Sequence, residues 1–315
     1  MAHRRIHRVA ILQTRHHLRT SAMDSVPHLF VKSVLCNVDG NALIQISKSL
    51  RSRRWALTAA SVQRKDWRFS AIEENDALFG IFSSGSGEET KFLSCEEFSA
   101  TKAISNQVTE IDFDTAERVF SAWNCGPKNK KWTKMSNRNE MATVLRLVLQ
   151  RLNFPYLSWL SLSVNDSFGM HSTFLDTILG KNARIEFLAL SHFSERSTRL
   201  LEQLLGQQCL VELSLFGSWE PRKTVDLLKK AMNQEELACV SCSTVDTLHF
   251  GRDYFNRKMG EWCRQGRESM SISLENACLW SENEKVEEGR YDYTFDGLNR
   301  VEIDVKESSF DVDLV

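Results

Sequence analysis

The amino-acid sequence predicts an α/β fold, namely a curved, mainly parallel sheet with helices on its outer side and a small helical module in front of it. Three observations predict this fold. A short apolar pattern recurs four times, a helix-forming stretch follows each copy, and the segment before residue 70 carries a different, helical pattern. One strand–helix unit cannot bury its own apolar side, so consecutive units are expected to stack into one core.

The recurring pattern is an apolar residue, two spacers, an apolar residue, one spacer and a third apolar residue. Its four copies are Leu157, Leu160 and Leu162; Ile185, Leu188 and Leu190; Leu210, Leu213 and Leu215; and Val245, Leu248 and Phe250. The middle residues of successive copies are 28, 25 and 35 positions apart. Such intervals are typical of leucine-rich-repeat solenoids, so we expect an irregular solenoid of this kind with the triplets side by side and pointing inward.

Each triplet is followed by residues with the apolar spacing of an amphipathic helix. The predicted helices cover residues 173–179, 195–205, 221–232 and 254–263, and a further helix with a buried stripe covers 140–152. Weaker copies of the triplet lie at Val108, Ile111 and Phe113, at Ile272 and Leu274, and at Leu298, Val301 and Ile303. We therefore expect about seven strands.

Residues 26–69 have a compact helical pattern. Pro27 suits the first turn of a helix, where its missing N–H would have no partner in any case. The apolar residues that follow on one helical face are Leu29, Phe30, Val34 and Leu35. A turn over residues 37–41 then leads to a second helical stretch over 43–50.

Composition and pattern divide the chain into four segments. They are a disordered or targeting extension over residues 1–22, the helical module over 23–70, a linker or irregular region over 71–105, and the repeat domain over 106–315. The first segment carries five Arg, four His and no acidic residue, which is typical of a mitochondrial presequence. Two other interpretations stay open, namely a disordered extension and sequence upstream of a true start at Met23.

Charge is distributed unevenly along the chain. The net charge is −1, yet residues 1–68 hold 13 Lys and Arg against 3 Asp, and residues 282–315 hold 11 Asp and Glu against 4 Lys and Arg. Either the basic and acidic ends of the chain contact different binding partners, or both are ordinary charged surfaces exposed to solvent. Basic residues gather only locally, at 48–54 and 128–134, so nucleic acid is not an expected partner.

The eight cysteines are widely and unequally spaced, unlike those of a secreted disulfide scaffold. The sequence has no uninterrupted run of about 18 apolar residues, the length that suggests a membrane helix. We therefore expect a soluble protein of the cytoplasm or nucleus, with no membrane contact.

One cysteine pair has metal-site spacing. Cys239 and Cys242 could be half of a zinc site, with His249 or Cys263 completing it, but the second closely spaced pair is missing. We therefore expect buried structural thiols, no metal and no cofactor. The sequence also lacks a metalloprotease helix, a nucleophile elbow and a nucleotide-binding loop, so no catalytic residue is predicted.

The helical module carries a resemblance to a known motif. Residues 26–67, with their Val-Pro opening, the Ile46-Ser47-Lys48 run and a following Trp55, resemble a divergent F-box. Together with the degenerate repeats, they resemble the large nematode group of F-box and F-box-associated proteins. The resemblance covers most of residues 23–315.

The resemblance implies a non-enzymatic role. An F-box docks on a Skp-type adaptor within a cullin-based ubiquitin ligase complex, and the repeat body holds a protein substrate, here unknown. The residues that would contact the adaptor are Val26, Pro27, Leu29, Phe30, Val34, Leu35, Ile46 and Trp55. This function is inferred by analogy of fold.

Two alternatives stay open. In the first, the chain is a repeat-built interaction scaffold without a ligase link, and its N-terminal helices only cap the open end of the solenoid. In the second, the chain is an enzyme whose site has no recognisable sequence pattern. A deep polar pocket with converging ionisable groups would favour the enzyme.

Overall fold

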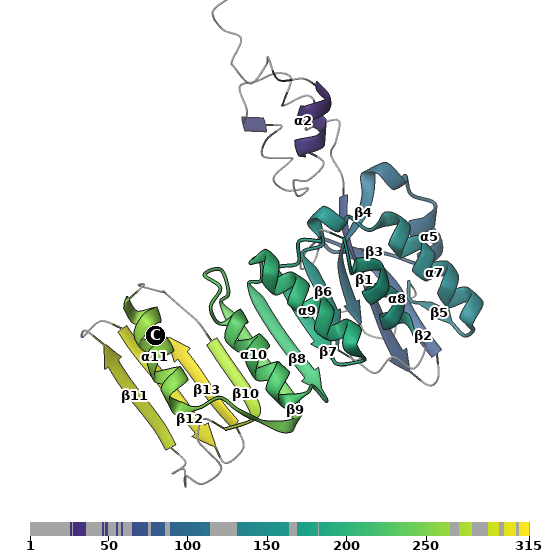
Figure 1. The fold of residues 1–315 in the computed structure, drawn as a ribbon. Coiled ribbons are helices and arrows are strands. Elements are labelled where there is room, and N and C mark those ends of the chain that lie inside the picture. The colour runs from purple at the N-terminus through teal and green to yellow at the C-terminus, as the bar shows by residue number, and fades with distance from the viewer. Residues whose placement is uncertain are drawn as a thin grey trace, which may run out of the picture. The chain divides into compact units, whose positions relative to one another are not determined.

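The structure is a computed structural model of the chain (Figure 1). It describes residues 26, 28–35, 46, 48–49, 55, 58, 65–74, 77–85, 89–113, 131–163, 169–181, 183–264, 271–278, 289–295, 299–306 and 309–314. The predicted extension over 1–22, the turn over 37–41 and most of the basic segment 128–134 lie outside these residues. The chain forms two compact units, one of residues 1–66 and 102–107 and the other of residues 67–101 and 108–315.

The first unit contains helix α2 (His28–Leu35), at the position predicted from Pro27 and the apolar residues after it. Ile46, Lys48 and Ser49 are also helical, in agreement with the second predicted stretch. The helical pattern expected to continue to residue 69 was wrong at its end, because Lys65–Glu74 forms a strand.

The second unit is built on one mixed sheet of 13 strands. In chain order these are β1 (Lys65–Glu74), β2 (Ala77–Ser84), β3 (Lys91–Leu93), β4 (Asn106–Phe113), β5 (Thr133–Met135), β6 (Trp159–Leu162), β7 (Phe187–Ser191), β8 (Glu212–Gly217), β9 (Cys239–His249), β10 (Ser271–Cys278), β11 (Gly289–Phe295), β12 (Asn299–Lys306) and β13 (Ser309–Leu314). In space they follow the order β3-β2-β1-β4-β6-β7-β8-β9-β10-β13-β12-β11, and β5 pairs with β2.

Strands β4, β6, β7, β8, β9 and β10 are parallel neighbours. The chain connects them through α7 (Arg138–Arg151), α8 (Met170–Ile178), α9 (Glu195–Gln207), α10 (Pro221–Ala231) and α11 (Arg252–Arg264). Parallel neighbours require such crossovers, and a helix is the usual one. The predicted α/β fold with a mostly parallel sheet is confirmed, and each predicted helix is present with ends shifted by a few residues.

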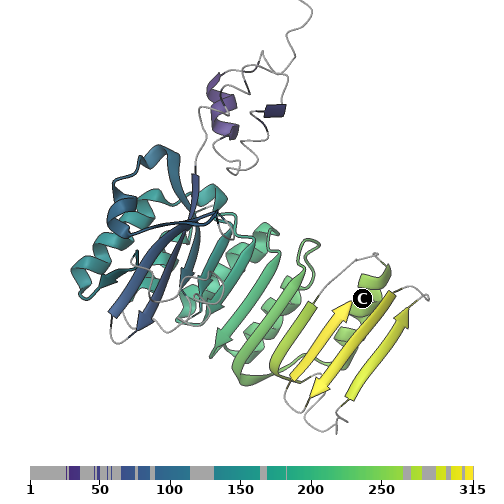
Figure 2. The ribbon, with the colours of Figure 1, turned by 180° about the vertical axis from the view of Figure 1, so that it is seen from behind.

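The helices α8 to α11 lie on one side of the sheet (Figure 1). Seen from behind, strands β6 to β10 present a face that these helices do not cover (Figure 2). The core lies between helices and strands, and Leu200, Leu201 and Leu204 of α9 are fully buried in it. Because strand side chains alternate between faces, every second residue of these strands points away from the helices.

The first three predicted triplets lie side by side, as expected. Leu160 pairs with Leu188, and Leu188 pairs with Leu213. All three are buried. On the other side of β6, Ile111 of β4 pairs with Leu160, so the weaker triplet at 108–113 also joins the row.

The fourth predicted triplet was wrong in register. Leu213 pairs with Val240, and Leu215 pairs with Cys242. Val240 therefore takes the middle position of the next unit, which the sequence pattern assigned to Leu248. Val245 is 69% exposed, so it does not occupy an inward triplet position.

The expected linker over residues 71–105 was also wrong. It contains most of β1, all of β2 and β3, and helix α5 (Cys95–Ser99). Strands β1 and β2 form an antiparallel hairpin in which Glu74 pairs with Ala77. Apolar residues alternate in the first half of β1, whereas β2 begins with an apolar run, and one face of the hairpin packs into the main core through Trp67, Phe69, Leu78 and Phe82.

The C-terminal strands do not continue the parallel series. Val301 and Ile303 of the predicted triplet at 298–303 lie in β12, which pairs antiparallel with both β11 and β13, and Leu298 lies outside the described residues. Only two residues separate β12 from β13, too few for the dozen or more that a parallel crossover needs. Strand β13 returns to pair antiparallel with β10.

Candidate protein-binding faces

An apolar cluster surrounds α2 in the first unit. Val31 and Leu35 are fully buried, and Val26, Ile46 and Trp55 pack against them. Sequence reasoning missed Val31, although it lies four positions before Leu35 and therefore on the same helical face. Four of the expected adaptor-binding residues thus contribute to the unit's own cluster.

The remaining expected adaptor-binding residues are not among the described members of this cluster. Phe30 is 57% exposed, and Val34 is half-buried. Leu29 lies in α2, but its side chain is outside the described residues, and so is Pro27. Within the described part of the first unit, Phe30 is the large apolar side chain that a partner can reach.

The second candidate surface is the face of β6 to β10 opposite the helices (Figure 2). We call it the open face. A row of small residues crosses it in register, namely Ser161, Ala189, Ser214, Ser241 and Ser273. The Ser241 hydroxyl lies 2.8 Å from that of Ser214 in a hydrogen bond. Small side chains leave room on a sheet surface for another chain to approach.

An aromatic pair lies on the open face beside this row. The rings of Trp159 and Phe187 stack with centroids 5.2 Å apart, and both side chains are partly exposed. The guanidinium carbon of Arg68 lies 5.1 Å from the Trp159 ring centroid. Arg68 also forms an ion pair and a hydrogen bond with Glu110, the residue that pairs with Trp159 across the strands.

The same register places acidic residues along one row of the sheet. Phe187 pairs with Glu212, which is followed by Cys239 and Ser271 on the next strands. The row then continues through Asp313, Glu302 and Asp292 on β13, β12 and β11.

A second row places Asp311 and Asp304 after Ser273. The acidic C-terminal composition is therefore arranged in rows that continue those of the open face.

Cys239 and Cys242 do not face each other. They are three residues apart in β9, so their side chains point to opposite faces of the strand. Cys242 is buried, whereas Cys239 is half-buried on the open face. Burial raises the pKa of the Cys242 thiol to about 12. Among the described residues, no cluster of three or more His, Cys, Asp or Glu side chains could hold a metal ion.

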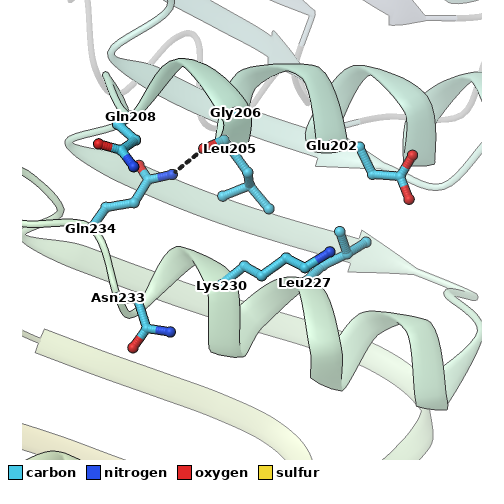
Figure 3. A pocket seen from close by; sticks show the side chains of 8 residues that line it. All are labelled: Glu202, Leu205, Gly206, Gln208, Leu227, Lys230, Asn233 and Gln234. Atoms are coloured by element: carbon cyan, nitrogen blue, oxygen red, sulfur yellow. Dashed lines mark hydrogen bonds between the residues drawn. The ribbon is translucent and has the colours of Figure 1, made fainter.

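A groove of about 410 Å³ lies on the helical side (Figure 3). It is lined by Glu202, Leu205, Gly206, Gln208, Leu227, Lys230, Asn233 and Gln234. These residues come from α9, α10 and the segments after them. The Gln234 amide donates a hydrogen bond to the Leu205 carbonyl, which ties two consecutive helices together. Such a groove is what two amphipathic helices leave between their solvent-facing sides.

No family model, curated protein or solved structure matches the chain. In the part of the chain that the structure describes, no helix has the length and apolar character needed to cross a membrane.

Proposed function

We propose that the chain is a non-enzymatic substrate-recognition adaptor of a cullin-based ubiquitin ligase. In this proposal the N-terminal module docks on a Skp-type adaptor protein, and the open face of the sheet holds a protein substrate. The parallel part of the sheet is then a leucine-rich-repeat-like solenoid. The pairing of Leu160, Leu188, Leu213 and Val240 on consecutive strands supports this assignment, because the sequence intervals between these residues fall within the range of that repeat class.

The observation that carries substrate binding is the row of small, partly exposed residues across β7 to β10, namely Ala189, Ser214, Ser241 and Ser273. Repeat solenoids use extended sheet surfaces of this kind to bind other proteins. The ligase link rests on the F-box resemblance and on Phe30. An apolar side chain that is 57% exposed on a helix is a candidate anchor for a partner, because anchors of this type dominate interface energetics.

The test is capture of recombinant Skp-type adaptor and cullin subunits by the purified full chain. Phe30→Asp is expected to abolish capture while leaving the fold intact. Val245→Asp changes the other large apolar residue that is exposed among those the structure describes. Val245 lies in β9, and this variant is expected to leave capture unchanged. Leu35→Asp is unsuitable as a docking variant because Leu35 is fully buried.

One observation favours the scaffold alternative. Leu35, Ile46 and Trp55 pack together around α2, as they would in a module whose apolar residues serve only its own stability. If the unmutated chain captures neither subunit, the ligase role is rejected and the scaffold function stands.

A further inference from the structure

Arg68, Glu110 and Trp159 form an arginine-binding arrangement within the chain itself. A glutamate and an aromatic ring are paired on adjacent strands, the guanidinium lies over the ring at 5.1 Å, and it forms an ion pair with the carboxylate. Arginine suits this setting because its planar cation both stacks on rings and binds carboxylates in a fixed geometry. The arrangement lies at one end of the open face.

The next two strands repeat the pairing. Phe187 and Glu212 are paired across β7 and β8, and Phe187 stacks on Trp159. Both side chains are partly exposed. Among the residues that the structure describes, no cation pairs with the Glu212 carboxylate. The aromatic ring and the carboxylate of the first arrangement are therefore present a second time, and no arginine of the described residues pairs with this carboxylate.

The register places further acidic residues beyond this pair. Three strands after Glu212, the same row reaches Asp313, then Glu302 and Asp292. Three strand spacings amount to roughly 14 Å, which equals about four residues of extended chain. An extended segment that crosses the strands with basic residues two or four positions apart would match the spacing of these acidic positions along the row. A nucleic-acid backbone would instead meet like charge.

We propose that the Phe187–Glu212 pair binds an arginine side chain of an extended, basic segment of a partner protein. The proposal rests on the proposed function, since it names the substrate class of the same open face. It commits to arginine rather than lysine because stacking on Phe187 and paired hydrogen bonding to Glu212 both require the planar guanidinium.

The probe is a fluorescein-labelled peptide of four Ser-Arg repeats, titrated with the full chain and followed by fluorescence anisotropy at low and physiological salt. Peptides of four Ser-Lys, Ser-Gln or Ser-Glu repeats and a labelled single-stranded RNA serve as comparisons. We expect the Ser-Arg peptide to bind most tightly. Replacing a stacked arginine by lysine is expected to weaken binding by roughly 5-fold, equivalent to about 1 kcal/mol.

The variants separate the pair from general negative charge. Glu212→Gln and Phe187→Leu are each expected to raise the Kd of the Ser-Arg peptide by roughly 5- to 10-fold. Glu202→Gln removes a carboxylate from the helical side and is expected to leave the Kd within about twofold. Circular dichroism and urea unfolding check that each variant is folded.

Several outcomes would overturn the proposal. They are equal binding of the Ser-Arg and Ser-Lys peptides, tighter binding of RNA than of peptide, or a Glu212→Gln effect no larger than that of Glu202→Gln. Capture of the Skp-type adaptor by Glu212→Gln is measured in parallel. Peptide binding without adaptor capture would reject the ligase role and keep the arginine site. Adaptor capture without peptide binding would reject the arginine site and keep the ligase role.

Discussion

The side chain of Gln234 donates a hydrogen bond from Nε2 to the backbone carbonyl of Leu205 at 2.9 Å. Gln234 follows α10, and Leu205 lies in the last turn of α9. The last carbonyls of a helix have no partner within the helix. The Gln234 side chain, which follows α10, therefore supplies a hydrogen-bond donor to a carbonyl at the end of the preceding helix, α9. Gln203 of α9 likewise bonds to the chain that follows α8, where its Oε1 accepts a hydrogen bond from the Gly180 N–H and its Nε2 donates one to the Lys181 carbonyl.

Replacing Gln234 by Ala should therefore lower the free energy of unfolding by about 1–2 kcal/mol, because a buried hydrogen bond is lost. Gln234 is 5% exposed. The neighbouring Asn233 is exposed, and Asn233→Ala should change stability by less than about 0.5 kcal/mol. Urea unfolding of the full chain measures both, and equal effects would contradict the structural role of the Gln234 amide.

The strand register predicts a contrast between two apolar residues. Leu213 is 0% exposed between Leu188 and Val240, so Leu213→Ala should destabilise the protein by about 2–5 kcal/mol through lost burial and a cavity. Val245 is 69% exposed, and Val245→Ala should have an effect below about 0.5 kcal/mol. The same urea titration measures the free energy of unfolding of Val245→Ala. A large decrease would favour the register in which Val245 points inward.

Two glycines should respond oppositely to alanine. A Cβ at Gly80 would lie 3.0 Å from both Met135 Cε and Phe69 Cε2, so Gly80→Ala should destabilise the protein by about 1–3 kcal/mol through overpacking. Gly206 lies in α9 with nothing within 4 Å of the added atom. Gly206→Ala should stabilise the protein by about 0.5–1 kcal/mol, because glycine is a poor helix former. Thermal unfolding would show a lower midpoint for the first variant and a higher one for the second.

The buried thiols predict a loss of stability at alkaline pH. Burial raises the pKa of Cys95 to about 11 and that of Cys242 to about 12, from an ordinary value of 9.0. Above pH 9 the unfolded chain releases these protons while the folded chain retains them, so stability falls as pH rises. Each thiol contributes about 1.4 kcal/mol per pH unit in that range.

The check is urea unfolding of the parent chain and of Cys242→Ala between pH 7 and pH 10. Cys242→Ala should be less stable at pH 7 because it leaves a cavity, but it should lose less stability than the parent as pH rises above 9. Cys239→Ala, which changes the half-buried thiol of the same strand, provides the comparison. If the free energy of unfolding falls equally steeply with pH in the parent and in Cys242→Ala, the Cys242 thiol has the same pKa in the folded and unfolded states.

The helices could be predicted closely because each has a long amphipathic pattern that few other structures produce. Residues 195–205 and 221–232 were expected, and α9 and α10 span Glu195–Gln207 and Pro221–Ala231. The buried stripe on each helix recurs with helical spacing over three turns. The shorter strand triplets carry less information, yet three of the four main ones are in the expected register.

The fourth triplet shows why short patterns mislead. Leu237, Val240 and Cys242 hold the inward positions before and within β9 and are buried. Cys242 occupies the last position of this triplet, where its buried thiol packs as a small hydrophobe. The match at 245–250 fits the same sequence pattern, and Leu248 and Phe250 are buried, but Val245 is exposed.

The β1–β2 hairpin was missed although the sequence contains a signal for it. Apolar residues alternate at Trp67, Phe69 and Ala71, and the two residues Asn75 and Asp76 separate the strands. Alternation before a two-residue polar break and a short apolar run after it together form a strand–turn–strand pattern. The helical pattern expected over residues 26–69 overlaps the first residues of β1, which hides this signal.

The aromatic and acidic pairs of the open face could not be predicted from sequence alone. Trp159, Phe187 and Glu212 lie far apart along the chain, and they become neighbours only through the register of three strands. A register error of one residue would move each to the opposite face. The sequence does predict an acidic C-terminal segment, but not that its charges continue the rows of the open face.

The position of β13 has a consequence for how the molecule assembles during synthesis. It lies between β10 and β12, so the hairpin of β11 and β12 joins the sheet only once β13 has paired with β10. Until then both β10 and β12 have an edge that can pair with another molecule. Loss of residues 309–314 would make that temporary state permanent, with self-association as the expected outcome.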